Sequence, residues 1–283
     1  MKHSIRASML PAYNDCPRRA AARQFKKEIQ GAGYKLRVQL PSIGAAVGTA
    51  VHKYIENYFV AKMQDLELAN PIDEVMSLFE DEIKTGVIWD DTTTSIDTAK
   101  MQIERMARVY IEGVGKDLTP LATEVAVEAE INDKWQLTGH IDLVCKGENG
   151  VVIRDWKTGA IVRSHHAQLG AYSLLWRSRD VVTGLAPDEP QTSNLKPIHV
   201  EGVAIDFIKR IPKRRGQEEA ICTIYDVGLC ERTAYATVFR IIGEFDKFME
   251  TGDYESFPAN PMSMLCTEKY CECFGSDFCP ITK

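Results

Sequence analysis

Hydrophobic residues along this chain change their spacing near residue 120. Before that point they recur every three to four residues, which is the spacing of amphipathic helices. The expected helices cover Ser8–Lys27, with Ser8 as the N-cap, and then Ala45–Lys62, Asp73–Lys84 and Thr93–Val114. The first part of the chain is therefore expected to form a helical lobe.

Beyond residue 120 the apolar positions alternate with polar ones, which is the period-two pattern of β-strands. The expected strands are Glu124–Ile131, Trp135–Lys146, Val151–Lys157, Val200–Ile208 and Ala220–Val227. Helical spacing returns at His165–Arg179 and Cys230–Met249, and a stretch rich in Pro, Asp, Ser and Asn predicts a loop over Gly184–Pro197. We expect an α/β fold in three parts: a helical lobe at 1–120, a core at 121–250 and a cysteine-rich segment at 251–283.

The composition is typical of a globular enzyme with one large domain or one domain with lobes, since 45% of the 283 residues are hydrophobic and 26% are charged. No apolar run reaches the roughly 18 residues that span a bilayer. The N-terminal residues also lack the apolar core of a signal peptide. We therefore expect a cytoplasmic protein that does not bind membranes.

The net charge of −6 gives the chain no global attraction for a polyanion, so nucleic-acid binding would depend on local basic patches. Two segments qualify. The first, near the N-terminus, contains Arg18, Arg19, Arg23, Lys26 and Lys27. The second contains Lys209, Arg210, Lys213, Arg214 and Arg215. Each segment is equally consistent with a solvated helix face or hairpin tip. The second would contact phosphates if the strand before it neighbours the acidic hairpin described next.

Two acids and a lysine are expected to meet on that hairpin. Asp142 and Asp155 lie in adjacent expected strands, and Lys157 follows Asp155 by two residues, so both side chains project from the same strand face. Carboxylate oxygens are the ligands that Mg²⁺ and Mn²⁺ prefer, and an ammonium group beside such a site stabilises developing negative charge. This arrangement suits metal-dependent hydrolysis of a phosphodiester.

A bare D-x-K is a weak signal, because any hairpin can carry these residues at a solvated edge. The ordered set is more specific, and it resembles the PD-(D/E)xK nuclease superfamily. Asp142 and Asp155-Trp156-Lys157 match its acid and acid-x-lysine motifs, and Gln168 to Tyr172 resemble the helical Q-x-x-x-Y motif of its RecB-like branch. The resemblance implies a central mixed β-sheet flanked by helices, as in restriction endonucleases.

Upstream, Gly48-Thr49-Ala50-Val51-His52 resembles the G-x-x-x-H motif that the RecB-like branch places before its core. A lone histidine on an apolar helix is more often structural, but within this motif the resemblance implies that His52 reaches the metal. Glu56, one turn later, is expected to form a surface salt bridge. No role is assigned to His140, His165 and His166, which flank the core motifs.

Four of the eight cysteines gather near the C-terminal end, at Cys266, Cys271, Cys273 and Cys279, whereas Cys16 lies far upstream. In a reducing compartment this clustering favours a metal site over disulfides, and the spacing leaves zinc and a 4Fe-4S cluster open. The RecB-like branch with an iron-sulfur cluster uses one upstream cysteine and three C-terminal ones. The resemblance, to AddB-type subunits and CRISPR-associated exonucleases, therefore implies a 4Fe-4S cluster on Cys16, Cys266, Cys271 and Cys279, with Cys273 as the alternative middle ligand. The thiols of Cys145, Cys222 and Cys230 are expected to be buried without a role.

The resemblance covers Ser8 to Pro280 and implies a DNA nuclease dependent on Mg²⁺ or Mn²⁺. The implied metal ligands are His52, Asp142, Asp155 and the backbone carbonyl of Trp156. The implied activity is that of an exonuclease on single-stranded or frayed DNA ends, with recombination or CRISPR proteins as partners. Phage recombination, repair and CRISPR adaptation are equally compatible settings.

The other implied roles are catalytic. Lys157 positions the attacking water, Gln168 orients Lys157 or the scissile phosphate, and Tyr172 supports the same wall or contacts the nucleic acid. Two alternatives remain open: a noncatalytic subunit that binds DNA ends or a partner, and an endonuclease that uses the same site.

Overall fold

The computed structural model describes residues 2–67, 70–159, 164–178 and 199–281, and the loop expected at Gly184–Pro197 lies outside them. The strands are β1 (His3–Arg6), β2 (Pro120–Asn132), β3 (Trp135–Lys146), β4 (Val151–Gly159), β5 (Val200–Lys209) and β6 (Ile221–Tyr225). The α-helices are α1 (Leu10–Asp15), α2 (Pro17–Gln24), α3 (Lys26–Gly31), α4 (Ile43–Met63), α5 (Ile72–Ile83), α6 (Ile96–Glu112), α7 (His166–Ser178) and α8 (Val227–Thr251). Two short 3-10 helices, η1 (Ala7–Met9) and η2 (Tyr254–Ser256), complete the described elements.

One mixed sheet holds the six described strands, and β3 pairs with three of the others. Near its start, β3 pairs in parallel with β1, with Ile5 opposite Leu137. Near its end, the same edge of β3 pairs antiparallel with β4, and β2 pairs along the opposite edge. The sheet continues through β4, β5 and β6. Because β5 runs parallel to β4, the basic loop after β5 follows a direct neighbour of the acidic hairpin.

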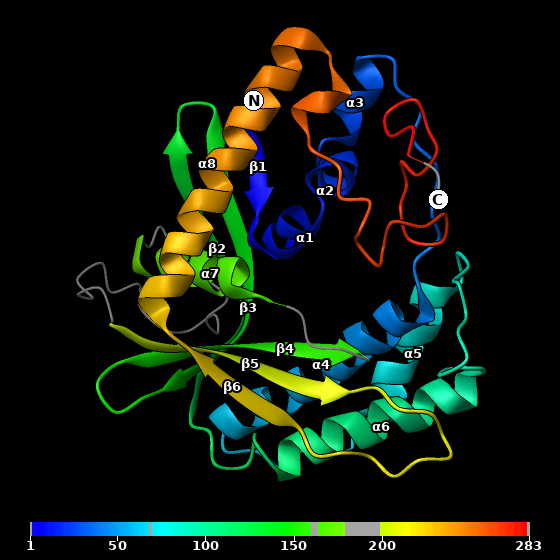
Figure 1. Cartoon of the computed structure of the whole chain (residues 1–283). Helices are drawn as coiled ribbons and strands as arrows, with labels where there is room; N and C mark the ends of the chain where they lie inside the picture. The colour runs from blue at the N-terminus through cyan, green and yellow to red at the C-terminus, as the bar shows by residue number, and fades with distance from the viewer. Residues whose placement is uncertain (1, 68–69, 160–163, 179–198, 282–283) are drawn as a thin grey trace.

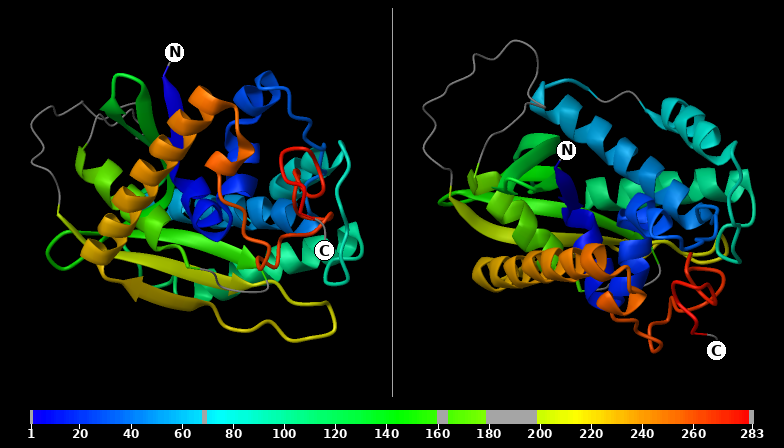
Figure 2. Two further views of the ribbon diagram at one scale, coloured as in Figure 1. Left: turned by 45° about the horizontal axis from the view of Figure 1, so that its top comes forward. Right: turned by 90° about the horizontal axis from the view of Figure 1, so that it is seen from above.

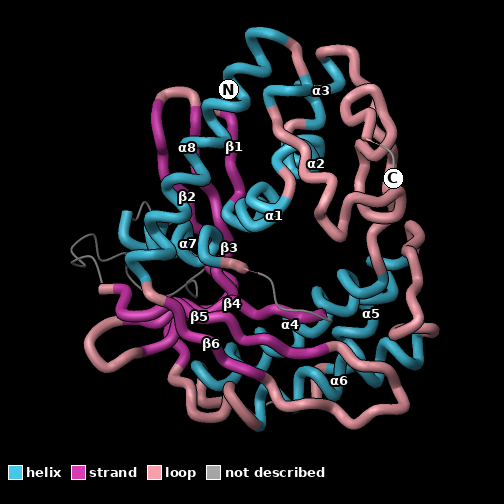
Figure 3. The backbone as a smooth tube through the Cα atoms, in the orientation of Figure 1, coloured by secondary structure: helices cyan, strands magenta, loops and turns pink. Residues whose placement is uncertain are grey.

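Helices cover both faces of the sheet, as Figures 1 and 2 show. One apolar core joins the sheet to α1, α2, α3, α7 and α8, and a second joins it to α4, α5 and α6. The predicted α/β class, with a central mixed sheet between helices, is therefore confirmed. The tube in Figure 3 shows that the C-terminal segment is mostly loop and lies near α2 and α3.

The expected helix over Ser8–Lys27 is wrong as a continuous element. The backbone of Cys16 is extended, at φ −151° and ψ 99°, and separates α1 from α2. Proline disfavours a helical conformation in the residue before it, so Pro17 ends α1 and begins α2. Ser8 lies within η1 and does not cap a helix. The break places the Cys16 thiol at a corner of the chain.

Three arginines of α2 hold the C-terminal segment against the start of the chain. Arg18 Nε donates to the carbonyl of Phe257 at 2.9 Å, and Arg19 Nη1 donates to Ser263 Oγ at 3.1 Å. Arg23 pairs with Glu272. The first two side chains are buried, so much of the basic patch expected at Arg18–Lys27 serves packing instead of presenting free charge.

The three-part division of the chain stays a prediction. Packing runs across the expected boundary at residue 120, because β1 belongs to the central sheet and α1 to α3 share a core with α7 and α8. Among the described helices, none is both long and apolar enough to cross a membrane.

Candidate metal-binding active site

The two predicted acids lie where β4 separates from β3. The last paired residues of this hairpin are Leu143 and Arg154, so Asp142 and Asp155 are the next residues on each strand. Beyond this point the N–H of Trp156 donates to Asp142 Oδ2 at 2.7 Å. A side-chain carboxylate thus binds a backbone donor of β4 and holds the fork between the strands at a fixed width.

Asp155 is almost fully buried and receives two side chains. Lys157 Nζ lies 2.6 Å from Asp155 Oδ2, as expected for residues two apart on a strand. From α7, Gln168 Nε2 donates to Asp155 Oδ1 at 3.0 Å and also to the hydroxyl of Tyr172 at 2.8 Å. The structure therefore brings together the predicted catalytic residues of β4 and α7.

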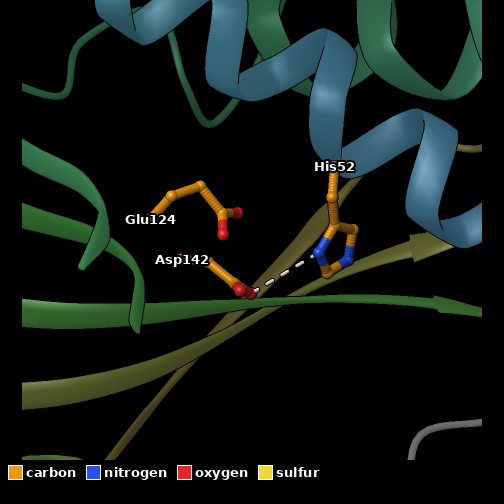
Figure 4. A group of neighbouring side chains, drawn as sticks. All are labelled: His52, Glu124 and Asp142. Atoms are coloured by element: carbon orange, nitrogen blue, oxygen red, sulfur yellow. Dashed lines mark ion pairs between the residues drawn. The ribbon is translucent and has the colours of Figure 1, made fainter. Parts of the chain in front are cut away.

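His52 reaches the same fork from the opposite helical layer. Its Nδ1 lies 3.8 Å from Asp142 Oδ2, and Figure 4 shows its ring on α4 above the strands. Gly48 permits this approach, because a Cβ there would lie 2.5 Å from Thr158 Oγ1 of β4. The first residue of the G-x-x-x-H motif therefore lets α4 pack closely on β4, and the last residue projects toward the acids.

Glu124 is a further polar residue of the site, and it was not predicted from the sequence. The β2–β3 register pairs Thr123 with Leu143 and Val125 with Ile141, which places Glu124 opposite Asp142. His52, Glu124 and Asp142 each offer a ligand atom within 4.8 Å of the others (Figure 4). Glu124 has φ +50°, a left-handed conformation that is strained for a residue with a side chain. Glu124 could have been recognised from the sequence as an acid opposite Asp142 only if the register between β2 and β3 had been known.

Burial and crowding alter the charge of this group. Burial raises the pKa of Asp142 and of Asp155 to about 6, although Lys157 acts in the opposite direction. Burial, together with the charges of Asp142 and Glu56, raises the pKa of Glu124 to about 8. Burial and the ammonium of Lys157 lower the pKa of His52 to about 4, so its imidazole is neutral and keeps a lone pair.

These side chains suit a hard divalent cation. Three carboxylates converge with one ammonium group, so the ionised site carries more negative than positive charge, and a neutral imidazole adds a nitrogen donor. The side chains of His52 and Lys157 remain about one quarter exposed, at 26% and 25%, which leaves the site open to solvent.

A buried polar network holds Trp156 from behind. Arg154 forms two hydrogen bonds with the Asp206 carboxylate, at 2.8 and 2.7 Å, and Tyr110 donates to the same carboxylate at 2.7 Å. The indole N–H of Trp156 donates to the Tyr110 hydroxyl at 3.0 Å. A buried charge pair of this kind requires full satisfaction of its hydrogen bonds, so Trp156 is fixed on both its backbone and its ring.

The basic loop after β5 is only partly free. Arg210 is bound to Asp90 at 3.0 and 2.7 Å, and Lys209 pairs with Glu218 at 2.8 Å. The side chains of Lys213, Arg214 and Arg215 are exposed. The nucleic-acid role of all five residues stays a prediction, but three of them have exposed side chains with no ion pair to any residue that the structure describes.

The expected cluster cysteines are buried at the junction between α2 and the C-terminal segment. The thiols of Cys271 and Cys273 lie 3.5 Å apart, and Arg18 Nη1 is 3.9 Å from Cys279 Sγ. The neighbouring Cys273 thiol and the Arg18 guanidinium lower the pKa of Cys279 to about 6, and the Cys273 thiol also lowers the pKa of Cys271 to about 7. The pKa of Cys273 itself is raised, so the three thiols share their protons. Cys16 and Cys266 are buried as well. Thiols that ionise readily near arginines are suitable metal ligands.

Comparison with known proteins gives a consistent picture. The family model of the PD-(D/E)XK nuclease superfamily matches residues 5–274. A crystal structure of a protein from Eubacterium rectale, described as a "putative exonuclease", has a TM-score of 0.51 and 12% identity, and the match covers 93% of this chain and 87% of that chain. At that identity the likeness shows a shared fold. A structure described as SSO0001 matches with a TM-score of 0.33 and 14% identity, over 84% of this chain and 77% of that chain. No curated protein matches the chain.

Gly48→Ala should weaken Mn²⁺ binding, because the added Cβ pushes α4 and His52 away from the strands. Loss of the contacts that position a metal ligand costs roughly tenfold to a hundredfold in metal affinity. Adding Thr158→Ala removes the clashing hydroxyl and should restore binding. Mn²⁺ titration followed by electron paramagnetic resonance measures both variants, and a double variant as weak as the single one would contradict the packing role of Gly48.

Glu124→Gln should have opposite effects on stability and on metal binding. At pH 7 the Glu124 carboxyl, whose pKa is raised to about 8 by burial and by the charge of Asp142, must take up a proton on folding, which costs stability in the metal-free protein. Gln removes this cost, and we expect the Tm in EDTA to rise by roughly 2 °C or more. The same change should lower Mn²⁺ affinity. Thermal unfolding with and without Mn²⁺ measures both effects, with Glu128→Gln on an exposed position of β2 as the matched control. An unchanged Mn²⁺ affinity would remove Glu124 from the site.

Proposed function

Because the chain belongs to the PD-(D/E)XK nuclease superfamily, we propose that it hydrolyses DNA phosphodiester bonds with Mg²⁺ or Mn²⁺ held at the β3–β4 fork. The observation that carries this proposal is the meeting of Asp142, Asp155, Lys157 and a neutral His52 at one point. The proposed metal ligands are His52, Asp142, Asp155 and the Trp156 carbonyl. Glu124 is added to this set on its proximity to Asp142.

When bound by these residues, a divalent cation would supply Lewis acidity at a phosphate oxygen and would make water a stronger nucleophile. The protein supplies the remaining contributions. Lys157 stays protonated, because the charges of Asp155 and Asp142 outweigh its burial and raise its pKa, and its ammonium orients the attacking water and stabilises the charge of the transition state. Gln168 holds Asp155 in place, and Tyr172, whose pKa burial raises well above the ordinary value, stays a hydrogen-bond donor.

We propose an exonuclease that acts on single-stranded or frayed DNA ends. The support is the resemblance of the motifs to the RecB-like branch and the description of the Eubacterium rectale protein as an exonuclease. Lys213, Arg214 and Arg215 are proposed to contact backbone phosphates, since their strand neighbours β4 and their side chains are exposed. Recombination, repair and CRISPR adaptation, with their partner proteins, are the proposed settings.

We also propose a 4Fe-4S cluster on Cys16, Cys266, Cys279 and one of Cys271 and Cys273. The support is that all five thiols are buried, that those of Cys271 and Cys273 lie 3.5 Å apart, and that the pKa values of Cys271 and Cys279 are lowered. Cys273 hydrogen-bonds to both neighbouring thiols, which makes it as well placed as Cys271. Such a cluster would fasten the C-terminal segment to the corner between α1 and α2, and its removal would act on folding before chemistry.

Asp155→Ala and Lys157→Ala should each reduce cleavage of end-labelled linear DNA by at least about a hundredfold, because each removes charge stabilisation from the transition state. Asp133→Ala and Lys134→Ala, on the exposed turn between β2 and β3, are matched controls that should retain full activity. Rates are measured with Mn²⁺ on linear and circular single strands.

Each outcome of that assay has a distinct meaning. Cleavage of linear strands alone supports the exonuclease, and cutting of circles would show an endonuclease. No cleavage of either substrate by the unaltered protein would favour a noncatalytic subunit. Activity that survives both active-site substitutions would mean that the chemistry occurs elsewhere.

Anaerobically purified protein should be brown, with a broad visible absorption band and bound iron. Cys279→Ser should bleach this band and lower the Tm, because the cluster would no longer join the C-terminal segment to the corner between α1 and α2. Cys230→Ser, which changes a buried thiol of α8 outside the cluster, is the control that should keep the band. If the protein is colourless and contains stoichiometric zinc, the cysteines bind zinc and the iron-sulfur proposal is wrong.

A further inference from the structure

His165 lies one helical turn before Gln168, next to the start of α7. Its Nδ1 is 3.3 Å from Gln168 Oε1, and its ring is half-buried. The neighbouring His166 instead contacts Ser164 Oγ at 2.9 Å and packs against the ring of Tyr225. Only one histidine of the pair therefore contacts the residues at the fork.

The chemistry of Gln168 fixes the direction of its hydrogen bonds. An ionised carboxylate only accepts, so the atom of Gln168 that faces Asp155 Oδ1 must be the amide nitrogen. The second proton of that nitrogen is directed at the Tyr172 hydroxyl. The amide oxygen then faces His165, and this contact is favourable only when His165 Nδ1 carries a proton.

This direction decides what Tyr172 can do. Because its oxygen accepts a proton from Gln168, its own O–H is available to a different acceptor. The charges of Asp155, Asp142 and Glu124 all act on this phenol, which places the hydroxyl beside the acids. A donor in that position suits a phosphate oxygen of the substrate. If the Gln168 amide were reversed, its oxygen would face Asp155 and would accept the hydrogen bond of the Tyr172 O–H, which could then not donate to the substrate.

We propose that His165 is a positioning residue that sets the direction of the Gln168 amide, and thereby keeps Asp155 in place and Tyr172 available as a donor to the substrate phosphate. The proposal rests on the nuclease function proposed above and assigns that site a further residue. In this arrangement the proton on His165 Nδ1 is donated to the Gln168 amide oxygen. The Gln168 amide nitrogen then donates to both Tyr172 and Asp155.

Two substitutions of nearly equal size separate this role from simple packing. Asn at position 165 can present an N–H about where Nδ1 lies, whereas Asp presents only oxygen acceptors there. His165→Asn should retain the kcat of the unaltered protein. His165→Asp should lower kcat by about tenfold or more with little change in KM, and should weaken Mn²⁺ binding by turning the amide oxygen toward Asp155. His166→Asp adds the same charge one residue away and should change neither quantity.

The readouts are kcat and KM on linear single-stranded DNA and Mn²⁺ affinity by electron paramagnetic resonance, with thermal unfolding of each variant. Equal values for the Asn and Asp variants, whether both are high or both are low, would overturn the positioning role. Failure of the unaltered protein to cleave DNA would overturn the proposed function instead. In that case the difference in Mn²⁺ affinity between the two variants still decides the role of His165, because it is measured without turnover.

Discussion

The hydrogen bond from the Trp156 N–H to the Asp142 carboxylate is the contact on which the site depends. It occurs where β3 and β4 stop pairing, and it satisfies a backbone donor that would otherwise be left without a partner inside the protein. The Asp142 carboxylate takes the place of a sheet hydrogen bond. It therefore holds the two strands at a fixed separation beyond their last paired residues. The opening admits His52 from one helical layer and Gln168 from the other, so residues separated by a whole sheet thickness act on the same pair of acids.

Fixing the fork requires rigidity behind it. The bidentate pair of Arg154 and Asp206, together with Tyr110, locks the indole of Trp156 from the face that carries α4 and α6. In front, burial and the charge of Asp142 raise the pKa values of Glu124 and Asp155. The hydrogen-bonded network behind Trp156 therefore supports a group of buried acids that destabilise the protein when no cation is bound. Sites that bind a cation commonly depend on a rigid scaffold in this way.

Much of the fold could be read from the sequence because its elements are long and regular. The strand expected at Trp135–Lys146 is β3 with the same ends, and α4 begins and ends within two residues of its expected range. β1 escaped notice because four residues are too few for a pattern to show. The break at Cys16 was missed although Pro17 signals it, because the apolar spacing continues across both helices.

The candidate site divides in the same way. Asp142, Asp155 and Lys157 could be placed from local spacing, since the period of a strand decides which side chains share a face. Glu124 could not, because its position depends on the register between β2 and β3, and Arg210 could not be recognised as a partner of Asp90, 120 residues earlier. Contacts between distant segments are set by tertiary packing, on which periodicity within one segment carries no information.

The junction between α2 and the C-terminal segment has a consequence for the order of events during synthesis. The arginines of α2 and the thiol of Cys16 leave the ribosome early, but their partners between Phe257 and Cys279 are among the last described residues to be made. Until then one end of the core that contains α7 stays uncovered. A nascent chain therefore cannot complete this face of the protein until the segment from Phe257 to Cys279 has been made.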